Sequence, residues 1–169
     1  QVGLASLLHD IGKIHIREEV LHKPGPLTAD EWDHMRQHPV IALQILAQVR
    51  SVADATAAIL HHHEHYDGSG YPDGLAGEAI PLISRILMVS DSFDAMTSDR
   101  PYRKAMPVGA AIEELRRHSG TQFDPKVVEA FLRRFEGKAI EAIQGSVAGS
   151  AAQPAVALLA SSGHGSPDN

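Results

Sequence analysis

The chain has 169 residues, of which 43% are hydrophobic, so it is long enough to form one domain with a substantial core. Its net charge of −6 argues against a general binder of DNA or RNA polymers, because such proteins need a basic face. The lack of cysteine excludes a disulfide scaffold and fits the reducing cytoplasm, and no apolar run is long enough to span a bilayer.

Helical periodicity dominates the first part of the chain. A first helix is predicted from an apolar face of three leucines: Leu4, Leu7 and Leu8. Gly12 is expected to help end this helix. Residues 16–27 contain Lys-Pro-Gly-Pro and are predicted to form a loop. Thr28 and Glu31 then have the spacing of a capping box, which predicts the start of the next helix.

Two more helices are predicted before a glycine-rich loop. Pro39 fits the first turn of one of them, with inner positions at Ile41, Ile45, Leu46 and Val49. The next spans about residues 52–63 and turns three side chains inward: Val52, Ala55 and Ile59. Residues 66–81 contain four glycines and two prolines, so their backbone is expected to bend sharply.

Three helices are predicted after this loop, and together the pattern predicts an all-α fold. The first starts at Pro81, the second covers about residues 108–118, and Asp124 with Pro125 starts the third. After Gly137 the composition shifts to Ala, Ser and Gly, so residues 138–169 are expected to form a flexible, low-complexity tail.

Six potential metal ligands occur in short motifs along the chain: His9, Asp10, His38, His62, His63 and Asp91. Imidazole and carboxylate ligands without thiolates suit iron, manganese, zinc or nickel. Neighbouring helical residues point about 100° apart, so His9 and Asp10 can reach different ions, and Asp10 is the best candidate for a bridging ligand. Two divalent ions a few ångströms apart are a recurrent arrangement for hydrolysing phosphate esters.

The ordered motifs HDIGK, HP, HHEHYDGSGYPDGL, DSFDAMTSDRPYR and GTQFDP closely resemble the HD-GYP domain, a branch of the HD phosphohydrolase superfamily. The resemblance implies a helical HD-domain bundle over residues 1–137, with a metal centre in its core. It implies two or three divalent ions, with iron or manganese ahead of zinc or nickel. Members of that family typically hydrolyse the bacterial second messenger cyclic di-GMP. The implied activity is therefore a phosphodiesterase that forms linear pGpG, GMP or both through a metal-bridging hydroxide.

The same resemblance implies roles for residues beyond the metal ligands. Lys13 matches an active-site lysine, so it is expected to act with Asp10 in catalysis, by neutralising a phosphate oxygen or assisting the leaving group. Tyr71, in the DGSGYP loop, can offer a hydroxyl and an aromatic face to a nucleotide. Arg100 and Arg103 fit bidentate recognition of phosphate.

Two other functions stay open: a catalytically weak cyclic di-GMP sensor or interaction module, and an HD hydrolase of another nucleotide. The complete set of ligand positions favours the enzyme, because a sensor would be free to lose ligands. Members of the family usually carry further ligands upstream, so we expect at least one N-terminal helix and an upstream sensory or receiver domain outside this sequence. A second copy of the chain and a diguanylate cyclase domain are the expected protein partners.

Overall fold

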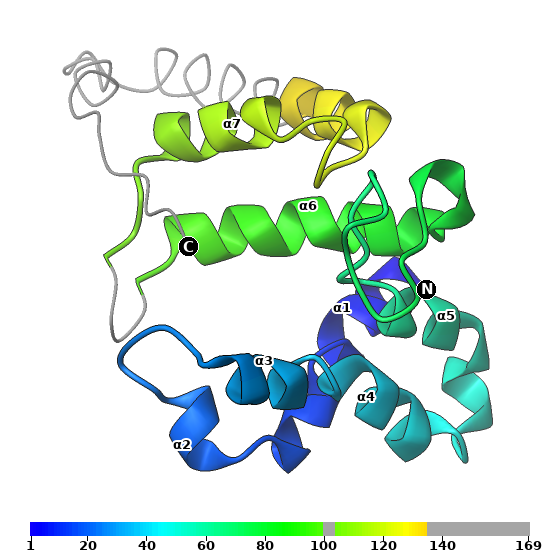
Figure 1. Ribbon diagram of the computed structural model, residues 1–169. Coiled ribbons are helices and arrows are strands. Elements are labelled where there is room, and N and C mark those ends of the chain that lie inside the picture. The colour runs from blue at the N-terminus through cyan, green and yellow to red at the C-terminus, as the bar shows by residue number, and fades with distance from the viewer. Residues whose placement is uncertain (100–103, 135–169) are drawn as a thin grey trace, which may run out of the picture.

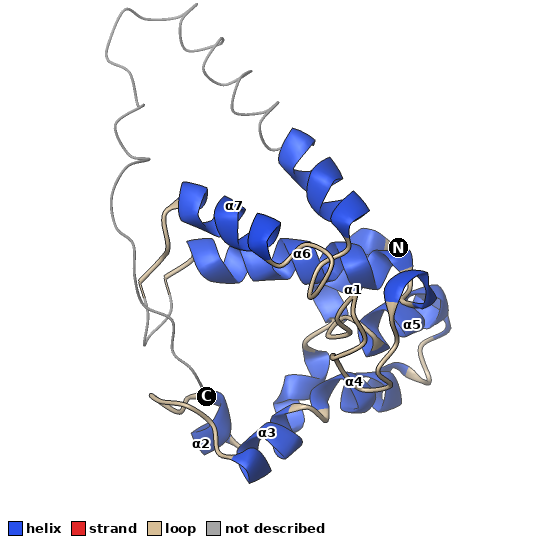
Figure 2. Cartoon of the chain, turned by 45° about the horizontal axis from the view of Figure 1, so that its top comes forward, coloured by secondary structure: helices blue, strands red, loops and turns tan. Residues whose placement is uncertain are grey.

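The computed structural model describes residues 1–99 and 104–134, and within them it contains helices and loops but no strand (Figure 1, Figure 2). The α-helices and the short 3₁₀ segments, labelled η, follow in this order: α1 Val2–Leu8, η1 Ile11–His15, α2 Glu18–Leu21, α3 Ala29–Met35, α4 His38–Leu46, η2 Arg50–Ala55, α5 Thr56–Leu60, η3 Gly77–Ala79, α6 Leu82–Thr97 and α7 Val108–Arg117. Residues 125–134 are also helical. The predicted all-α fold is confirmed. None of these helices is long and apolar enough to cross a membrane.

Helix α6 lies between two hydrophobic clusters and packs along α7 (Figure 1). The first cluster joins α1, α4, η2, α5 and α6 through Ala5, Ala42, Leu46, Val52, Ala55, Ala58, Ile59 and Leu87. The second joins α6, α7 and the last described helix through Met88, Val89, Leu115, Phe123, Val127, Val128 and Leu132. Asp91 lies four residues after Leu87, so it projects from the α6 face that covers the first cluster.

The tightest backbone approach in the first half joins η1 to α4. A Cβ atom on Gly12 would lie 1.9 Å from the carbonyl oxygen of His38 and 2.8 Å from the amide nitrogen of Ala42. Only glycine therefore fits at this crossing. The prediction that Gly12 ends the first helix is wrong, because α1 already ends at Leu8 and Gly12 lies inside η1.

The glycine-rich loop is attached to the turn that precedes the last described helix. The amide of Tyr66 donates to the carbonyl of Gln122 at 3.2 Å, and the amide of Asp67 donates to the carbonyl of Thr121 at 2.9 Å. Inside the loop, a Cβ on Gly70 would lie 2.2 Å from the backbone nitrogen of His65, so the loop folds closely over its own start. This loop thus connects the turn after α5 to the turn before the last described helix.

A buried ion pair holds α6 against the start of the last helix. Arg85 lies 2.6 Å from Asp124, whose side chain is 1% exposed. The other carboxylate oxygen of Asp124 accepts from the amide of Lys126 at 2.8 Å, as the predicted N-cap requires. The capping box of Thr28 and Glu31 is also present, so both capping predictions are confirmed.

Other local predictions are wrong. A short helix, α2, forms inside residues 16–27 because Val20 is buried there. Leu46 is buried as predicted, but Ile45 and Val49 are 38% and 43% exposed, because α4 buries Ala42 in place of Ile45 and ends before Val49. The helix predicted over 52–63 consists of η2 followed by α5, which ends at Leu60, although its three inward residues are buried as predicted. The predicted tail, residues 138–169, lies outside the described residues.

Candidate metal centre

Three histidines are oriented in the same way, each at the end or start of a helix. In each ring Nδ1 lies against the backbone carbonyl three residues earlier: His9 with Ser6 at 2.8 Å, His38 with Met35 at 2.8 Å, and His62 with Ile59 at 2.6 Å. A carbonyl oxygen only accepts, so each Nδ1 carries the proton and donates it. Each Nε2 is then left with a free lone pair, the arrangement that metal-binding histidines use.

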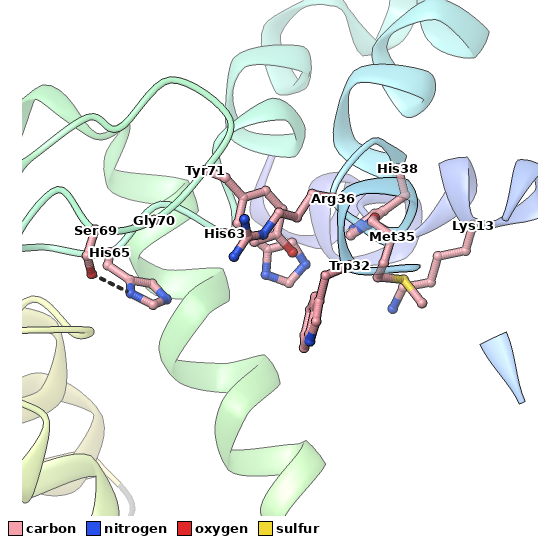
Figure 3. A pocket seen from close by; sticks show the side chains of 10 residues that line it. All are labelled: Lys13, Trp32, Met35, Arg36, His38, His63, His65, Ser69, Gly70 and Tyr71. Carbon is pink, nitrogen blue, oxygen red and sulfur yellow. Dashed lines mark hydrogen bonds between the residues drawn. The ribbon is translucent and has the colours of Figure 1, made fainter. Parts of the chain in front are cut away.

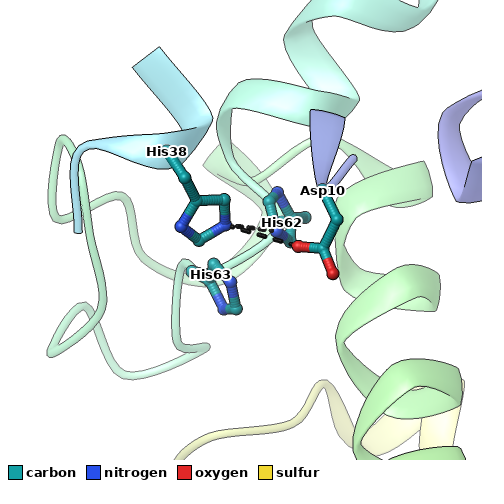
Figure 4. A group of neighbouring side chains, drawn as sticks. All are labelled: Asp10, His38, His62 and His63. Carbon is teal, nitrogen blue, oxygen red and sulfur yellow. Dashed lines mark hydrogen bonds and ion pairs between the residues drawn. The ribbon is translucent and has the colours of Figure 1, made fainter. Parts of the chain in front are cut away.

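Two of these lone pairs, those of His38 and His62, point toward each other. The Nε2 atoms of His38 and His62 lie only 3.4 Å apart. Since both are acceptors, this contact is repulsive unless a cation lies near them. A donor atom from each of Asp10, His38, His62 and His63 lies within 4.8 Å of all the others (Figure 4). Four donors at such short mutual distances suit a single cation at their centre.

The carboxylate of Asp10 lies between two of the imidazoles. Its Oδ1 is 3.6 Å from Nε2 of His38, and its Oδ2 is 3.6 Å from Nε2 of His9. Oδ2 also contacts Nζ of Lys13 at 2.7 Å. Oδ1 of Asp10 and Nε2 of His9 are buried and find no hydrogen-bond partner among residues 1–99 and 104–134. Buried polar atoms without partners are costly, and a bound metal ion would satisfy both.

Asp91 approaches the cluster from α6. Its Oδ1 is 3.7 Å from Nε2 of His9. This interaction raises the pKa of His9 and lowers the pKa of Asp91. Rings of His9 and His62 pack edge to face with centroids 5.0 Å apart, so His9 joins the other histidines to Asp91. The structure therefore brings all six predicted ligand residues together, from the turn between α1 and η1, from α4 and α6, and from the turn after α5. Their role as ligands stays a prediction.

Burial keeps the inner imidazoles neutral. Desolvation lowers the pKa of His62 to about 4 and also lowers the pKa values of His38 and His63. Neutral imidazole is the form that binds a metal ion. The donor set, its unpartnered buried atoms and its protonation state all fit one or more divalent cations.

A pocket of about 380 Å³ opens beside these histidines (Figure 3). Lys13, His38 and His63 line its inner part. Tyr71 stacks on His63, with ring centroids 4.9 Å apart and 22° between the planes, so Tyr71 lies next to the candidate metal centre as well as in the pocket. A substrate in this pocket would contact both the lysine and the tyrosine that the sequence singled out.

Sequence reasoning missed one whole wall of the pocket. Trp32, Met35 and Arg36 line it from the end of α3. Their spacing of three and four residues on a helix that leads directly to His38 was the available signal. His65, for which no sequence motif predicted a role, also lines the pocket.

A second missed residue is Glu64, between His63 and His65. Its side chain is buried, and Oε1 accepts from the amide of Asp73 at 2.7 Å, which ties down the far end of the glycine-rich loop. Two predicted substrate residues, Arg100 and Arg103, lie outside the described residues.

Residues 1–127 match the family model of the HD domain. The chain is 48% identical over 158 residues to a cyclic di-GMP phosphodiesterase response regulator of Xanthomonas campestris pv. campestris, covering 92% of this chain and 41% of that protein. It is 47% identical over 135 residues to a cyclic di-GMP phosphodiesterase of Thermotoga maritima, covering 79% of this chain and 37% of that protein.

Relatives with a different named substrate also match. A 3′3′-cGAMP-specific phosphodiesterase of Vibrio cholerae is 41% identical over 136 residues, which cover 78% of this chain and 26% of that protein. A crystal structure of a cyclic GMP-AMP-specific phosphodiesterase of V. cholerae has a similar fold, with a TM-score of 0.60 and 22% identity over 80% of this chain and 37% of that one. The chain thus spans less than half the length of each of these relatives.

Proposed function

Because the chain belongs to the HD domain family, we propose that it is a metal-dependent phosphodiesterase that hydrolyses cyclic di-GMP to linear pGpG, GMP or both. The convergence of the Asp10 carboxylate with the imidazoles of His38, His62 and His63 beside an open pocket carries the proposal. The names of the relatives with 48% and 47% identity support the choice of cyclic di-GMP.

We infer that the six ligand residues hold two or three divalent ions, with iron or manganese ahead of zinc or nickel. The six residues are His9, Asp10, His38, His62, His63 and Asp91. Asp10 has one carboxylate oxygen facing His9 and the other facing His38, which supports its assignment as a bridging ligand. Divalent ions bound there would polarise the phosphoryl group and lower the pKa of water.

The protein's own side chains would bind and orient the phosphodiester. The Lys13 ammonium lines the pocket and touches Asp10, so it is placed to neutralise a phosphate oxygen or to assist the leaving group. Tyr71 would present its ring and hydroxyl from the opposite loop, while His63 keeps its ring in place by stacking. Arg100 and Arg103 are proposed as further phosphate ligands, on the resemblance alone.

Hydrolysis of 3′3′-cGAMP is the second candidate, because a relative with 41% identity is named for that substrate. The test is to load the purified protein separately with Fe²⁺, Mn²⁺, Zn²⁺ or Ni²⁺, measure bound metal, and follow both dinucleotides by chromatography. We expect cyclic di-GMP to be consumed faster and pGpG or GMP to appear. Binding of cyclic di-GMP without turnover under every metal would show a sensor instead of an enzyme. The upstream domain, the protein partners and the cytoplasmic location stay predictions.

A further inference from the structure

Four flat side chains, His63, Tyr71, Arg36 and Trp32, lie in a row that starts at the candidate metal centre and lines the pocket. His63 stacks on Tyr71 with centroids 4.9 Å apart. The guanidinium of Arg36 lies 5.6 Å from the centroid of the Tyr71 ring and 5.9 Å from that of the Trp32 ring. All four residues line the same pocket (Figure 3).

The outer two members of this row, Arg36 and Trp32, have no evident structural role. Trp32 is 45% exposed and belongs to neither hydrophobic cluster. Arg36 is exposed, and its guanidinium makes no ion pair with any carboxylate in residues 1–99 and 104–134. The exposed indole leaves a large apolar surface in contact with water. The guanidinium contacts aromatic rings, so its N–H donors stay available to a ligand. Both properties suit a ligand with a flat face and acceptor atoms at its edge.

We propose that Trp32 and Arg36 form a guanine subsite, in which the indole stacks on the base and the guanidinium donates to its O6 and N7 atoms. This assignment rests on the proposed function, since a phosphodiester held at the metal centre must extend its sugar and base outward through the pocket. Aromatic side chains stack on any base, whereas a bidentate Arg pairs with the two acceptors of guanine. Adenine presents an amino donor where guanine has O6, so Arg36 would disfavour it.

Tryptophan emission tests the stacking directly, because Trp32 is the chain's single tryptophan. The metal-loaded protein is titrated with GMP and, separately, with ribose 5-phosphate, which has the sugar and phosphate without a base. We expect GMP alone to change the emission in a saturable way. Equal responses to the two ligands, or no response to GMP, would overturn the subsite.

Substitutions test the division of labour between the two residues. Trp32→Leu should weaken GMP binding, measured by calorimetry, by a factor between about 5 and 150, and Trp32→Phe should restore most of it. Arg36→Gln should remove the preference for GMP over AMP, which we expect to lie in the same range in the unaltered protein. Arg50→Gln is the matched control, because Arg50 is exposed in η2 and does not line the pocket.

The outcomes separate this inference from the proposed activity. Turnover of cyclic di-GMP with an unchanged KM in Trp32→Leu would refute the subsite and leave the phosphodiesterase intact. A base-dependent emission change without turnover under any metal would support the subsite and refute the phosphodiesterase. Loss of GMP binding in Trp32→Phe as severe as in Trp32→Leu would also count against stacking, since phenylalanine keeps an aromatic face.

Discussion

Replacing Gly12 by alanine should damage both the fold and the candidate metal centre. The new Cβ would lie 1.9 Å from the carbonyl oxygen of His38, and real Cβ atoms essentially never come within 3.0 Å of such a neighbour. Both atoms are fixed to backbone, so no rotamer change can relieve the clash, and η1 must separate from α4 by more than 1 Å. The substitution acts directly on the segment that carries His38.

The expected magnitudes follow from that displacement. Overpacking of a well-packed contact costs about 1–3 kcal/mol, and a backbone-to-backbone clash belongs at the upper end. The better helix propensity of alanine returns at most about 1 kcal/mol, so the net effect remains destabilising. Metal–ligand distances tolerate deviations of only about 0.2 Å. Moving His38 should therefore lower metal affinity by about 10-fold to 100-fold.

Urea denaturation of the metal-free protein measures the packing cost, and calorimetric titration with Mn²⁺ measures the affinity. Gly3→Ala is the matched control, because Gly3 lies in α1 and its Cβ would meet no atom within 4 Å. That variant should gain up to about 1 kcal/mol and bind metal normally. If Gly12→Ala unfolds at the same urea concentration as the unaltered protein and binds Mn²⁺ equally well, the close approach of η1 to α4 is wrong.

Two further substitution pairs test the site and the fold. Asp10→Ala should abolish turnover and lower the metal content, whereas Lys13→Ala should reduce turnover with the metal still bound. Elemental analysis measures the metal content of each variant. Equal metal loss in both would contradict the distinction between a ligand and a catalytic residue. Arg85→Met should destabilise the protein by about 3–5 kcal/mol in urea denaturation, because it leaves the buried carboxylate of Asp124 without its partner. Lys126→Met, which breaks an exposed ion pair with Glu78, should leave stability nearly unchanged, and a similar loss in the two variants would contradict the role of burial.

The fold could be predicted where local chemistry decides it. The capping box at Thr28 and the Asp124 cap involve atoms within three residues of each other, so spacing alone finds them. Gly12 was misread because the reason for glycine there is a carbonyl 26 positions later in the chain, and no local pattern reports such a contact. The same limit explains Ile45, whose exposure depends on which face of α4 meets η1 and α5.

Some residues of the candidate site could also be predicted from the sequence, and others could not. The six candidate ligands were found because imidazole and carboxylate groups in ordered motifs are rare and chemically specific. Trp32 and Arg36 were missed because an aromatic and a cation on a helix usually serve packing or solvation, and only the tertiary structure places them beside Tyr71. Glu64 was missed for the opposite reason, since a Glu between histidines attracts attention only once its burial is known.

The burial of the histidines also affects how many protons the site releases when a metal ion binds. Because the pKa values of His38, His62 and His63 lie below the usual value near 6.5, these rings are already neutral at pH 7. His9 differs from these three rings, because its pKa is raised, chiefly by Asp91. The three inner imidazoles should therefore release almost no protons on metal uptake, and calorimetry in buffers of different ionisation enthalpy would test this. Burial keeps these three rings neutral below pH 7, so acidification from pH 7 to 6 should weaken metal loading less than it would for a cluster of exposed histidines.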